Sequence, residues 1–239
     1  MPENMSHQMM GYDRTSTMFS PDGRLLQVEY AKKTVRQGST AIGIVFANGV
    51  LLVTDRRVND KLIVAESVEK LFKVDDHIGA AVSGFISDGR VLIEKARVKA
   101  QQYRVTYDES IDVLELVKNI SDMKQAFSQY GGARPFGVSI LFAGIDDSGT
   151  KLYATEPSGI FFQYRATAIG EGELEIGKFL SEQYRDGMNL DEAFKLAIKC
   201  FKNVLGKDFD PVRLTAGYID TTDRKFTKYD PNQIKKLAK

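Results

Sequence analysis

Residues 12–31 read YDRTSTMFSPDGRLLQVEYA, which places a polar turn, a capped helix and an aromatic-acid pair ahead of an apolar strand. Ser20 and Pro21 predict the start of a helix. The serine hydroxyl can accept from an orphan backbone N–H, and proline at the first helical position has no N–H to leave unpaired. Apolar residues follow at spacings of three and four, at Leu25, Val28, Ala31 and Val35. This spacing predicts one apolar face that lies on a larger body.

The chain after this helix changes to the period of β-strands. Residues 40–46 (TAIGIVF) and 50–54 (VLLVT) flank Asn48-Gly49, which is a strong hairpin signal. Further strands are expected at 71–74 and 77–83, and helices near 88–103 and 108–127. The first half therefore predicts strands followed by a pair of helices.

The second half of the chain repeats this order. Strands are expected near 137–143, 151–155, 160–164 and 166–169, helices near 173–184 and 190–205, and a last hairpin near 213–219 and 225–229 before a short basic tail at 233–239. Asn189 and Glu192 form a capping-box pattern, worth about 1 kcal/mol, at the start of the clearest helix. Each half of the chain thus has strands followed by helices. This order favours two stacked antiparallel sheets with helices on their outer faces.

The composition describes a nearly neutral chain. Its 239 residues, 43% of them apolar, can build one large core. The 33 basic and 32 acidic residues leave a formal net charge of +1, so the charge favours neither a nucleic-acid partner nor a membrane partner. The single cysteine, Cys200, excludes an internal disulfide.

The sequence carries no pattern for a metal, a cofactor or a targeting segment. The only histidines are His7 and His77, which form no metal-ligand cluster, so no metal and no cofactor are expected. The first eleven residues lack the basic and apolar regions of a signal peptide. The apolar runs are far shorter than the roughly 20 residues of a membrane span. A cytoplasmic location is expected.

The residues around Ser39 invite a catalytic interpretation. Gly38-Ser39 precedes the first strand and Asp55 and Lys70 follow, which are the parts of an N-terminal nucleophile hydrolase. Such an enzyme uses the α-amine of its nucleophile as the base, because that amine has a pKa of about 7.7 to 8.0. Here 38 residues precede Ser39, so the amine is an amide and a base worth about 100- to 10,000-fold in rate is missing. Catalysis would require self-cleavage after Gly38. Without catalysis, Asp55 and Lys70 can be an ion pair that the fold retains from related enzymes.

A series of motifs runs in order from Gly11 to Ile219: YDR, SPDGRLLQVEYA, GSTAIGI, FANGVLLVTDRRV, ESVEK, QYGGARPFGVSILFAG and ATAIG. With these motifs the chain resembles the α-subunits of archaeal-type 20S proteasomes. The resemblance implies an α+β fold, a four-layer αββα sandwich of two antiparallel sheets flanked by helices, as in N-terminal nucleophile hydrolases, with an extra N-terminal helix. It also implies a single α-type domain, 12–239, behind a mobile gate tail, 1–11.

The same resemblance implies a function without catalysis. The chain would form a homo-heptameric α-ring that gates access to the chamber of a threonine-type endopeptidase complex, whose activity resides in the β-subunits. The rings would stack in the order αββα. A proteasome-activating AAA ATPase would dock on the α-ring by its C-terminal tails, and unfolded protein substrates would pass through the pore.

Three groups of residues match functional positions of that family. The cluster that holds the gate open matches Tyr12, Asp13, Arg14, Pro21, Glu29 and Tyr30. The pocket for a regulator tail with a penultimate tyrosine matches Lys70, Gly38 and Leu25, with Lys70 facing the terminal carboxylate. The annulus behind the gate matches Tyr130, Gly131 and Gly132.

Plainer interpretations stay open beside these matches. Lys70 can be a solvated lysine beside Glu66 and Glu69, because such surface pairs are common and weak. The first cluster can be an ordinary helix cap, and the glycine pair a tight turn. Two other functions also remain: a self-processed hydrolase that uses Ser39, and a scaffold or adaptor ring without a protease inside.

Overall fold

Ten strands form the centre of the structure, a computed structural model that describes residues 11–58, 60, 62–64 and 67–237. The strands are β1 (Ala41–Phe46), β2 (Gly49–Asp55), β3 (Leu71–Asp75), β4 (Ile78–Gly84), β5 (Val138–Asp146), β6 (Gly149–Thr155), β7 (Phe161–Gln163), β8 (Ala166–Ile169), β9 (Leu214–Asp220) and β10 (Thr227–Lys228). They make two antiparallel sheets, ordered β10-β9-β2-β1-β8 and β3-β4-β5-β6-β7. The expected gate tail lies outside the described residues, apart from Gly11.

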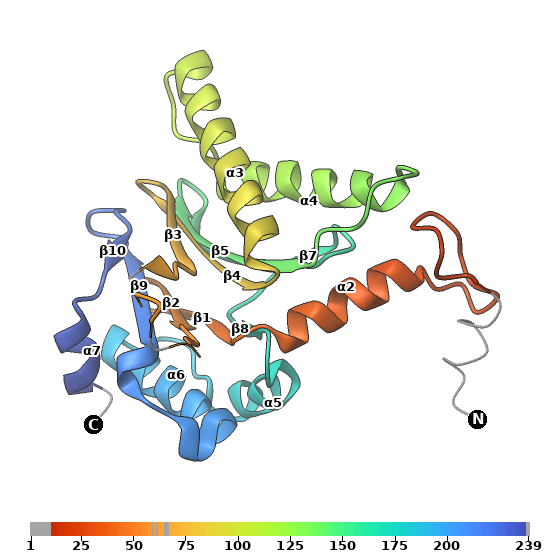
Figure 1. Cartoon of the computed structure of the whole chain (residues 1–239). Helices are drawn as coiled ribbons and strands as arrows, with labels where there is room; N and C mark the ends of the chain where they lie inside the picture. The colour runs from red at the N-terminus through yellow and green to blue at the C-terminus, as the bar shows by residue number, and fades with distance from the viewer. Residues whose placement is uncertain (1–10, 59, 61, 65–66, 238–239) are drawn as a thin grey trace.

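Helices cover the outer face of each sheet (Figure 1). They are α2 (Leu26–Gln37), α3 (Ile86–Tyr107), α4 (Val113–Gln129), α5 (Glu173–Gln183), α6 (Leu190–Leu205) and α7 (Pro231–Leu237), with short 3-10 turns at Gly206–Asp208 and Pro211–Arg213. Helices α5 and α6 pack on the first sheet, and α3 and α4 pack on the second. Helix α2 approaches one end of the sandwich. The expected four-layer fold with an extra N-terminal helix is confirmed.

The alternation of side chains along the central strands builds these layers. In β2, Leu51 and Val53 face the helices of the first layer, whereas Val50 and Leu52 face the opposite sheet. All four are essentially inaccessible to solvent. Because successive side chains point to opposite faces, a strand that is apolar throughout can fill two layers at once.

The predicted β1–β2 hairpin is present, with its turn displaced by one residue. Phe46 pairs with Gly49, so Ala47 and Asn48 form the loop. A Cβ placed on Gly49 would lie 2.0 Å from the carbonyl oxygen of Ile219 in β9. The glycine is therefore needed for the close approach of the neighbouring strand, rather than for the turn.

The predicted helix start at Ser20-Pro21 is wrong. The N–H of Gly23 donates to the Ser20 carbonyl at 2.8 Å, and the N–H of Arg24 donates to the Ser20 hydroxyl at 3.2 Å. Gly23 has a φ of 73°, and α2 begins only at Leu26. Pro-Asp-Gly is itself a turn signal, and it prevails over the capping pattern here. The expected apolar face is confirmed at Val28, Ala31 and Val35, while Leu25 is half-buried.

The basic tail expected after residue 233 is also wrong, since this segment belongs to helix α7. Asp230 accepts from the N–H of Asn232 at 2.7 Å, and the Gln233 side chain accepts from the N–H of Asp230 at 3.2 Å. Ile234 is buried in the first core layer. Asp-Pro with a glutamine three residues after the aspartate is the signal that could have found this helix.

Lysine 124 lies fully buried on α4, against the second sheet. Its ammonium donates to the Thr155 hydroxyl at 2.6 Å, and to the carbonyl oxygens of Val138 at 3.1 Å and Thr155 at 3.4 Å. Burial lowers the pKa of Lys124 from 10.5 to about 7, opposed by the charge of Glu156. The unfolded chain therefore binds more protons at this site than the folded chain between about pH 7 and 10.5.

Replacing Lys124 by methionine is expected to flatten the pH dependence of stability. In the wild type this lysine makes the free energy of unfolding rise with pH across that window, by up to about 1.4 kcal/mol per pH unit. Urea unfolding at about pH 7.5 and 9.5 measures the slope. Lys118→Met, at an exposed position of the same helix, should keep the wild-type slope. Equal slopes in all three proteins would contradict the role of Lys124.

Candidate functional site

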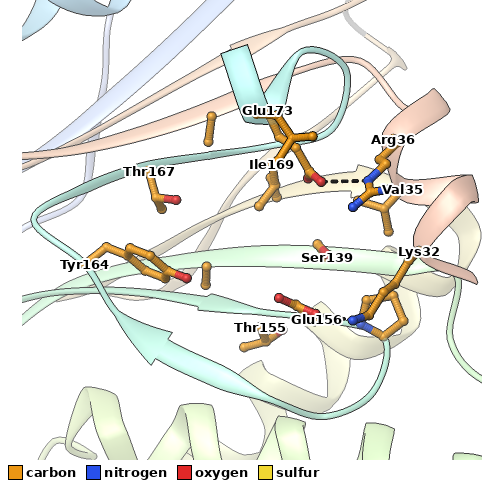
Figure 2. Close-up of a pocket in the computed structure, with 14 residues that line it drawn as sticks. Lys32, Val35, Arg36, Ser139, Thr155, Glu156, Tyr164, Thr167, Ile169 and Glu173 are labelled. Carbon is orange, nitrogen blue, oxygen red and sulfur yellow. Dashed lines mark hydrogen bonds and ion pairs between the residues drawn. The ribbon is translucent and has the colours of Figure 1, made fainter. Parts of the chain in front are cut away.

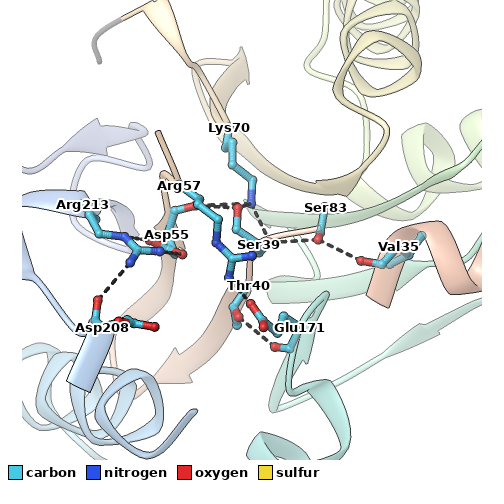
Figure 3. Close-up of polar contacts among 10 residues, drawn as sticks. All are labelled: Val35, Ser39, Thr40, Asp55, Arg57, Lys70, Ser83, Glu171, Asp208 and Arg213. Atoms are coloured by element: carbon cyan, nitrogen blue, oxygen red, sulfur yellow. Dashed lines mark hydrogen bonds and ion pairs between the residues drawn. The ribbon is translucent and has the colours of Figure 1, made fainter. Parts of the chain in front are cut away.

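Ser39 lies between the end of α2 and the start of β1, and Lys70 reaches it from the residue ahead of β3 (Figure 3). The Lys70 ammonium lies 2.6 Å from the Ser39 hydroxyl and 2.6 Å from the Ser39 carbonyl oxygen. It lies 3.3 Å from the carbonyl oxygen of Asp55, which also accepts from the Ser39 hydroxyl at 2.9 Å. The three parts expected from the sequence therefore come together.

The expected ion pair between Asp55 and Lys70 is wrong. The fully buried carboxylate of Asp55 instead accepts from Arg213, with Nε at 2.9 Å and the second contact at 2.6 Å. Arg213 immediately precedes β9, and Leu214 pairs with Asp55 across the sheet. A bidentate guanidinium satisfies both carboxylate oxygens. The pairing of β2 with β9 therefore supplies a partner that lies far away in the sequence.

Lysine 70 is not a solvated surface lysine, which corrects the plainer interpretation. Its exposed fraction is only 3%. Glu69, one of the two acidic neighbours in the sequence, pairs with Lys228 at 2.5 Å, and Glu66 lies outside the described residues. Burial lowers the pKa of Lys70 from 10.5 to about 7, with Asp55 opposing and Arg57 adding to the effect. Lys70 is thus a buried amine.

The peptide bond ahead of Ser39 is integrated into the fold. The N–H of Gly38 donates to the Val35 carbonyl at 2.9 Å, and the Gly38 carbonyl accepts from the N–H of Glu171 at 2.9 Å. A Cβ on Gly38 would lie 2.3 Å from the backbone nitrogen of Gly84. Only glycine fits this approach. On the other side of the bond, the Ser39 carbonyl accepts from Lys70 at 2.6 Å and from the Ser83 hydroxyl at 2.9 Å.

Helix α2 is joined to both halves of the sandwich across a pocket of about 250 Å³ (Figure 2). The Lys32 ammonium lies 3.0 Å from Glu156, beside the second sheet, and Arg36 donates to Glu173 of α5 at 2.9 Å. Such partly exposed pairs contribute about 0 to 1 kcal/mol each, so the buried apolar face of α2 supplies most of its attachment. The segment ahead of Ser39 is part of the folded body.

The first predicted cluster is partly brought together. The Tyr30 hydroxyl donates to the Asp13 carboxylate at 3.3 Å, and the Gln27 amide donates to the Asp13 carbonyl at 2.6 Å. Pro21 and Glu29 are exposed, and within the described residues neither is hydrogen-bonded to this pair. Gln27 was missed, although its position three residues before Tyr30 places both on one helix face.

The predicted annulus residues lie in an exposed turn beside the N-terminal segment. Tyr130, 63% exposed, ends α4, and Gly132 has a φ of 82°, which favours glycine. The Ser16 hydroxyl donates to the Tyr130 carbonyl at 3.4 Å. Residues 14–17 and 131–134, with Gln27, line a pocket of about 410 Å³. The structure therefore places Arg14 and the glycine turn on one pocket.

A buried carboxylate anchors the end of this turn. Asp88 accepts from both terminal nitrogens of Arg134, at 2.6 and 2.8 Å, and from the N–H of Gly137 at 2.9 Å. These donors hold the pKa of the Asp88 carboxyl below its usual value against the opposing effect of burial, the largest single influence. Sequence reasoning missed Asp88 because its partners lie 46 and 49 residues away.

Neither a metal-binding cluster nor a membrane-spanning helix is found in the part of the chain that the structure describes. No group of three or more His, Cys, Asp and Glu side chains in those residues is arranged to hold a metal ion. None of the described helices combines the length and apolar character needed to cross a membrane.

Comparison with known families identifies the family of the chain. The proteasome subunit family matches residues 35–219, and the N-terminal signature of A-type proteasome subunits matches residues 12–33. The chain belongs to the proteasome subunit family. The signature marks it as an α-type member of that family, which confirms the resemblance on which the sequence interpretation depends.

Curated relatives agree along nearly the whole length. The chain is 49% identical over 226 residues to the proteasome alpha subunit of Archaeoglobus fulgidus, covering 95% of this chain and 92% of that protein. It is 47% identical over 225 residues to the Methanosarcina mazei protein, covering 94% and 90%. It is 49% identical over 226 residues to the Methanocaldococcus jannaschii protein, covering 95% and 86%. Each of these is named as the alpha subunit of a proteasome.

The two family matches adjoin within helix α2 of this α-type proteasome subunit, a few residues ahead of Ser39. The N-terminal signature contains Asp13, Tyr30 and most of α2, and the second match starts at Val35, four residues before Ser39. Helix α2, Leu26–Gln37, therefore spans the boundary between the two matches.

Proposed function

We propose that this α-type subunit does no chemistry and instead controls access to the proteolytic chamber of the 20S proteasome. The observation that carries the proposal is the hydrogen bonding around the Gly38–Ser39 peptide bond: Gly38 is held through its backbone N–H and carbonyl, and the Ser39 carbonyl accepts from Lys70 and Ser83. Residues 12–239 form a single α-type domain, and residues 1–11 form the gate tail. The complex works in the cytoplasm, and the β-subunits provide the threonine-type endopeptidase activity.

The chemistry of Ser39 supports a non-catalytic role. The hydroxyl has a lysine at 2.6 Å, as a nucleophile of this fold requires. Its own nitrogen, however, is an amide and cannot act as a base, so the proton of the hydroxyl has no α-amine to accept it. Loss of the α-amine, the base on which N-terminal nucleophile hydrolases depend, removes about 100- to 10,000-fold in rate.

A homo-heptameric ring is the assembly that this proposal requires. Closed rings arise when one surface of a subunit binds a different surface of the next copy. The α-rings then cap two β-rings, and unfolded protein substrates cross the α-ring on their way to the chamber. The α-type signature and the near full-length match to named α-subunits support this arrangement.

Negative-stain electron microscopy of the purified chain tests the assembly. Ring-shaped particles with sevenfold symmetry are the expected result. Monomers, or rings with another symmetry in every preparation, would contradict the proposed α-ring. Peptidase activity that appears only when a second, related subunit co-purifies would exclude a scaffold or adaptor ring without a protease inside.

The gate is proposed to involve two groups of residues that lie near each other. The open-state cluster is Tyr12, Asp13, Arg14, Pro21, Glu29 and Tyr30, and the annulus is Tyr130, Gly131 and Gly132. The hydrogen bond from Ser16 to Tyr130 supports their proximity. Single contacts of this kind contribute about 0.5 to 1.5 kcal/mol, which suits a gate whose two states differ by a few kcal/mol.

Regulator docking is proposed to centre on Lys70, with Gly38 and Leu25 in the same pocket. The C-terminal tail of a proteasome-activating AAA ATPase would place its terminal carboxylate at the Lys70 ammonium. The absence of any carboxylate hydrogen-bonded to Lys70 among the described residues supports this role. Gly38 has a separate structural reason to be glycine, because it packs on Gly84.

A self-processed hydrolase is the second candidate, and one observation favours it. The Lys70 amine lies within hydrogen-bonding distance of the Ser39 hydroxyl, so cleavage after Gly38 would complete the catalytic set of an N-terminal nucleophile hydrolase. The structural attachment of α2 opposes it, since a removable segment has no need of ion pairs to both halves of the sandwich.

A further inference from the structure

The amine of Lys70 is surrounded by uncharged oxygens. Its three hydrogen-bonding neighbours are the carbonyl oxygens of Ser39 and Asp55 and the hydroxyl of Ser39 (Figure 3). Only 3% of the residue is exposed, so little water reaches the amine. A buried ammonium ordinarily requires a carboxylate partner, because removing a charge from water costs several kcal/mol.

Three charged groups near Lys70, all in the described part of the chain, are engaged with other partners. The Asp55 carboxylate accepts from Arg213, and Glu69 pairs with Lys228. Arg57, whose charge acts against that of Lys70, forms an ion pair with Glu171. Within the described residues, no carboxylate oxygen is hydrogen-bonded to the Lys70 amine. The described part of the subunit thus provides this amine with no counter-ion in contact.

An ammonium can donate to all three neighbouring oxygens, and an uncharged amine can also satisfy them if the Ser39 hydroxyl turns its hydrogen from the Asp55 carbonyl to the Lys70 nitrogen. The uncharged amine has two N–H groups, which can donate to the two carbonyl oxygens, and one lone pair, which can accept from the Ser39 hydroxyl. Burial lowers the pKa of Lys70 to about 7, so near neutrality a large fraction of the free subunits holds the amine uncharged. The uncharged form binds a carboxylate poorly, because it lacks the opposite charge.

We infer that a terminal carboxylate supplies the counter-ion that Lys70 lacks, and that its docking takes up one proton from solution. The proton binds to the Lys70 nitrogen, and the Ser39 hydroxyl turns its hydrogen to the Asp55 carbonyl at 2.9 Å. No covalent bond is made or broken. The inference rests on the proposed docking of regulator tails and adds that their affinity is set by pH.

The sign and size of the effect follow from linkage. A terminal carboxylate has a pKa of about 3.3 to 3.7, so it stays charged near neutrality. Affinity is expected to be nearly constant below about pH 6.5 and to weaken up to about tenfold per pH unit above about pH 7.5, where each docking event must bind a proton. Between about pH 6.5 and 8.5 the dissociation constant should rise on the order of 20-fold.

Calorimetric titration of the assembled ring with a synthetic peptide tests the inference. The probe is an N-acetylated peptide with a penultimate tyrosine and a free terminal carboxylate, and the same peptide ending in an amide is the control. Near pH 8.5, the binding enthalpy in phosphate and in Tris should differ by the enthalpy of one proton leaving the buffer. At about pH 6.5 the difference should be small.

A Lys70→Arg ring is the matched variant, because a guanidinium stays charged over this whole range. Its binding should show neither the pH dependence nor the proton uptake. If the wild-type ring binds the peptide with equal affinity near pH 6.5 and 8.5, and the binding enthalpy does not depend on the buffer, the proton coupling is overturned. The proposed docking would be unaffected by that result. Failure of the peptide to bind at any pH would overturn docking itself. The buffer comparison needs only the wild type, so it decides the matter even if the variant does not fold.

Discussion

Replacing Lys70 by alanine is expected to abolish the stimulation of peptide hydrolysis by a ring ATPase while the α-ring still assembles. The substitution removes the amine that is proposed to receive the carboxylate of a docking tail. A charge-assisted hydrogen bond of this kind contributes about 1.5 to 3 kcal/mol, and several tails dock at once, so the loss multiplies around the ring. Stimulation is measured as the ratio of hydrolysis rates with and without the ATPase.

Lys73→Ala is the matched control for this experiment. Lys73 lies on β3, its side chain is 52% exposed and it pairs with Asp76 at 2.5 Å, so it carries the same charge outside the proposed pocket. The control should keep wild-type stimulation. Class averages from electron micrographs of both variants establish that the ring is intact. Unchanged stimulation in an intact Lys70→Ala ring would contradict carboxylate capture.

Deleting residues 1–12 is expected to accelerate the hydrolysis of peptides and unfolded proteins without any regulator. The deletion removes the proposed gate tail together with Tyr12, and leaves the hydrogen bonds of Asp13 to Tyr30 and Gln27 in place. If the open state is the minor one, at roughly 0.1 to 10% of the population, opening it fully raises passage by about tenfold or more.

The readout is the hydrolysis rate per active site of the complete particle, with sites counted by covalent inhibitor labelling. Counting the active sites distinguishes faster entry of substrate from a change in the number of active β-subunits. A rate per site equal to that of the wild type, for both a short peptide and an unfolded protein, would show that these residues do not close the pore.

Local signals in the sequence predicted the parts of the fold that local hydrogen bonds determine. The capping box of α6 is present as expected, with Asn189 accepting from the N–H of Glu192 at 2.9 Å and the reciprocal contact at 2.8 Å. The error at Ser20 arose where two local signals compete. A helix cap and a Pro-Asp-Gly turn use the same residues, and the positive φ of Gly23 accompanies the turn.

The chemistry of the candidate site depended on contacts that no local pattern contains. The family resemblance pointed to Lys70, but its burial and its three oxygen neighbours follow from the meeting of separate segments. Arg213 and Asp55 are 158 residues apart, and only the pairing of β2 with β9 joins them. That pairing takes the Asp55 carboxylate away from Lys70, which is why the expected ion pair is replaced by a buried amine.

The intact mass of the purified chain, measured after assembly with a β-subunit into an active particle, tests the absence of catalysis most directly. A single species of about 26.7 kDa, with the Gly38–Ser39 bond unbroken, is the expected result. A shorter species that has lost its first 38 residues and begins at Ser39 would contradict the account, because it would give the hydroxyl the free amine that catalysis requires.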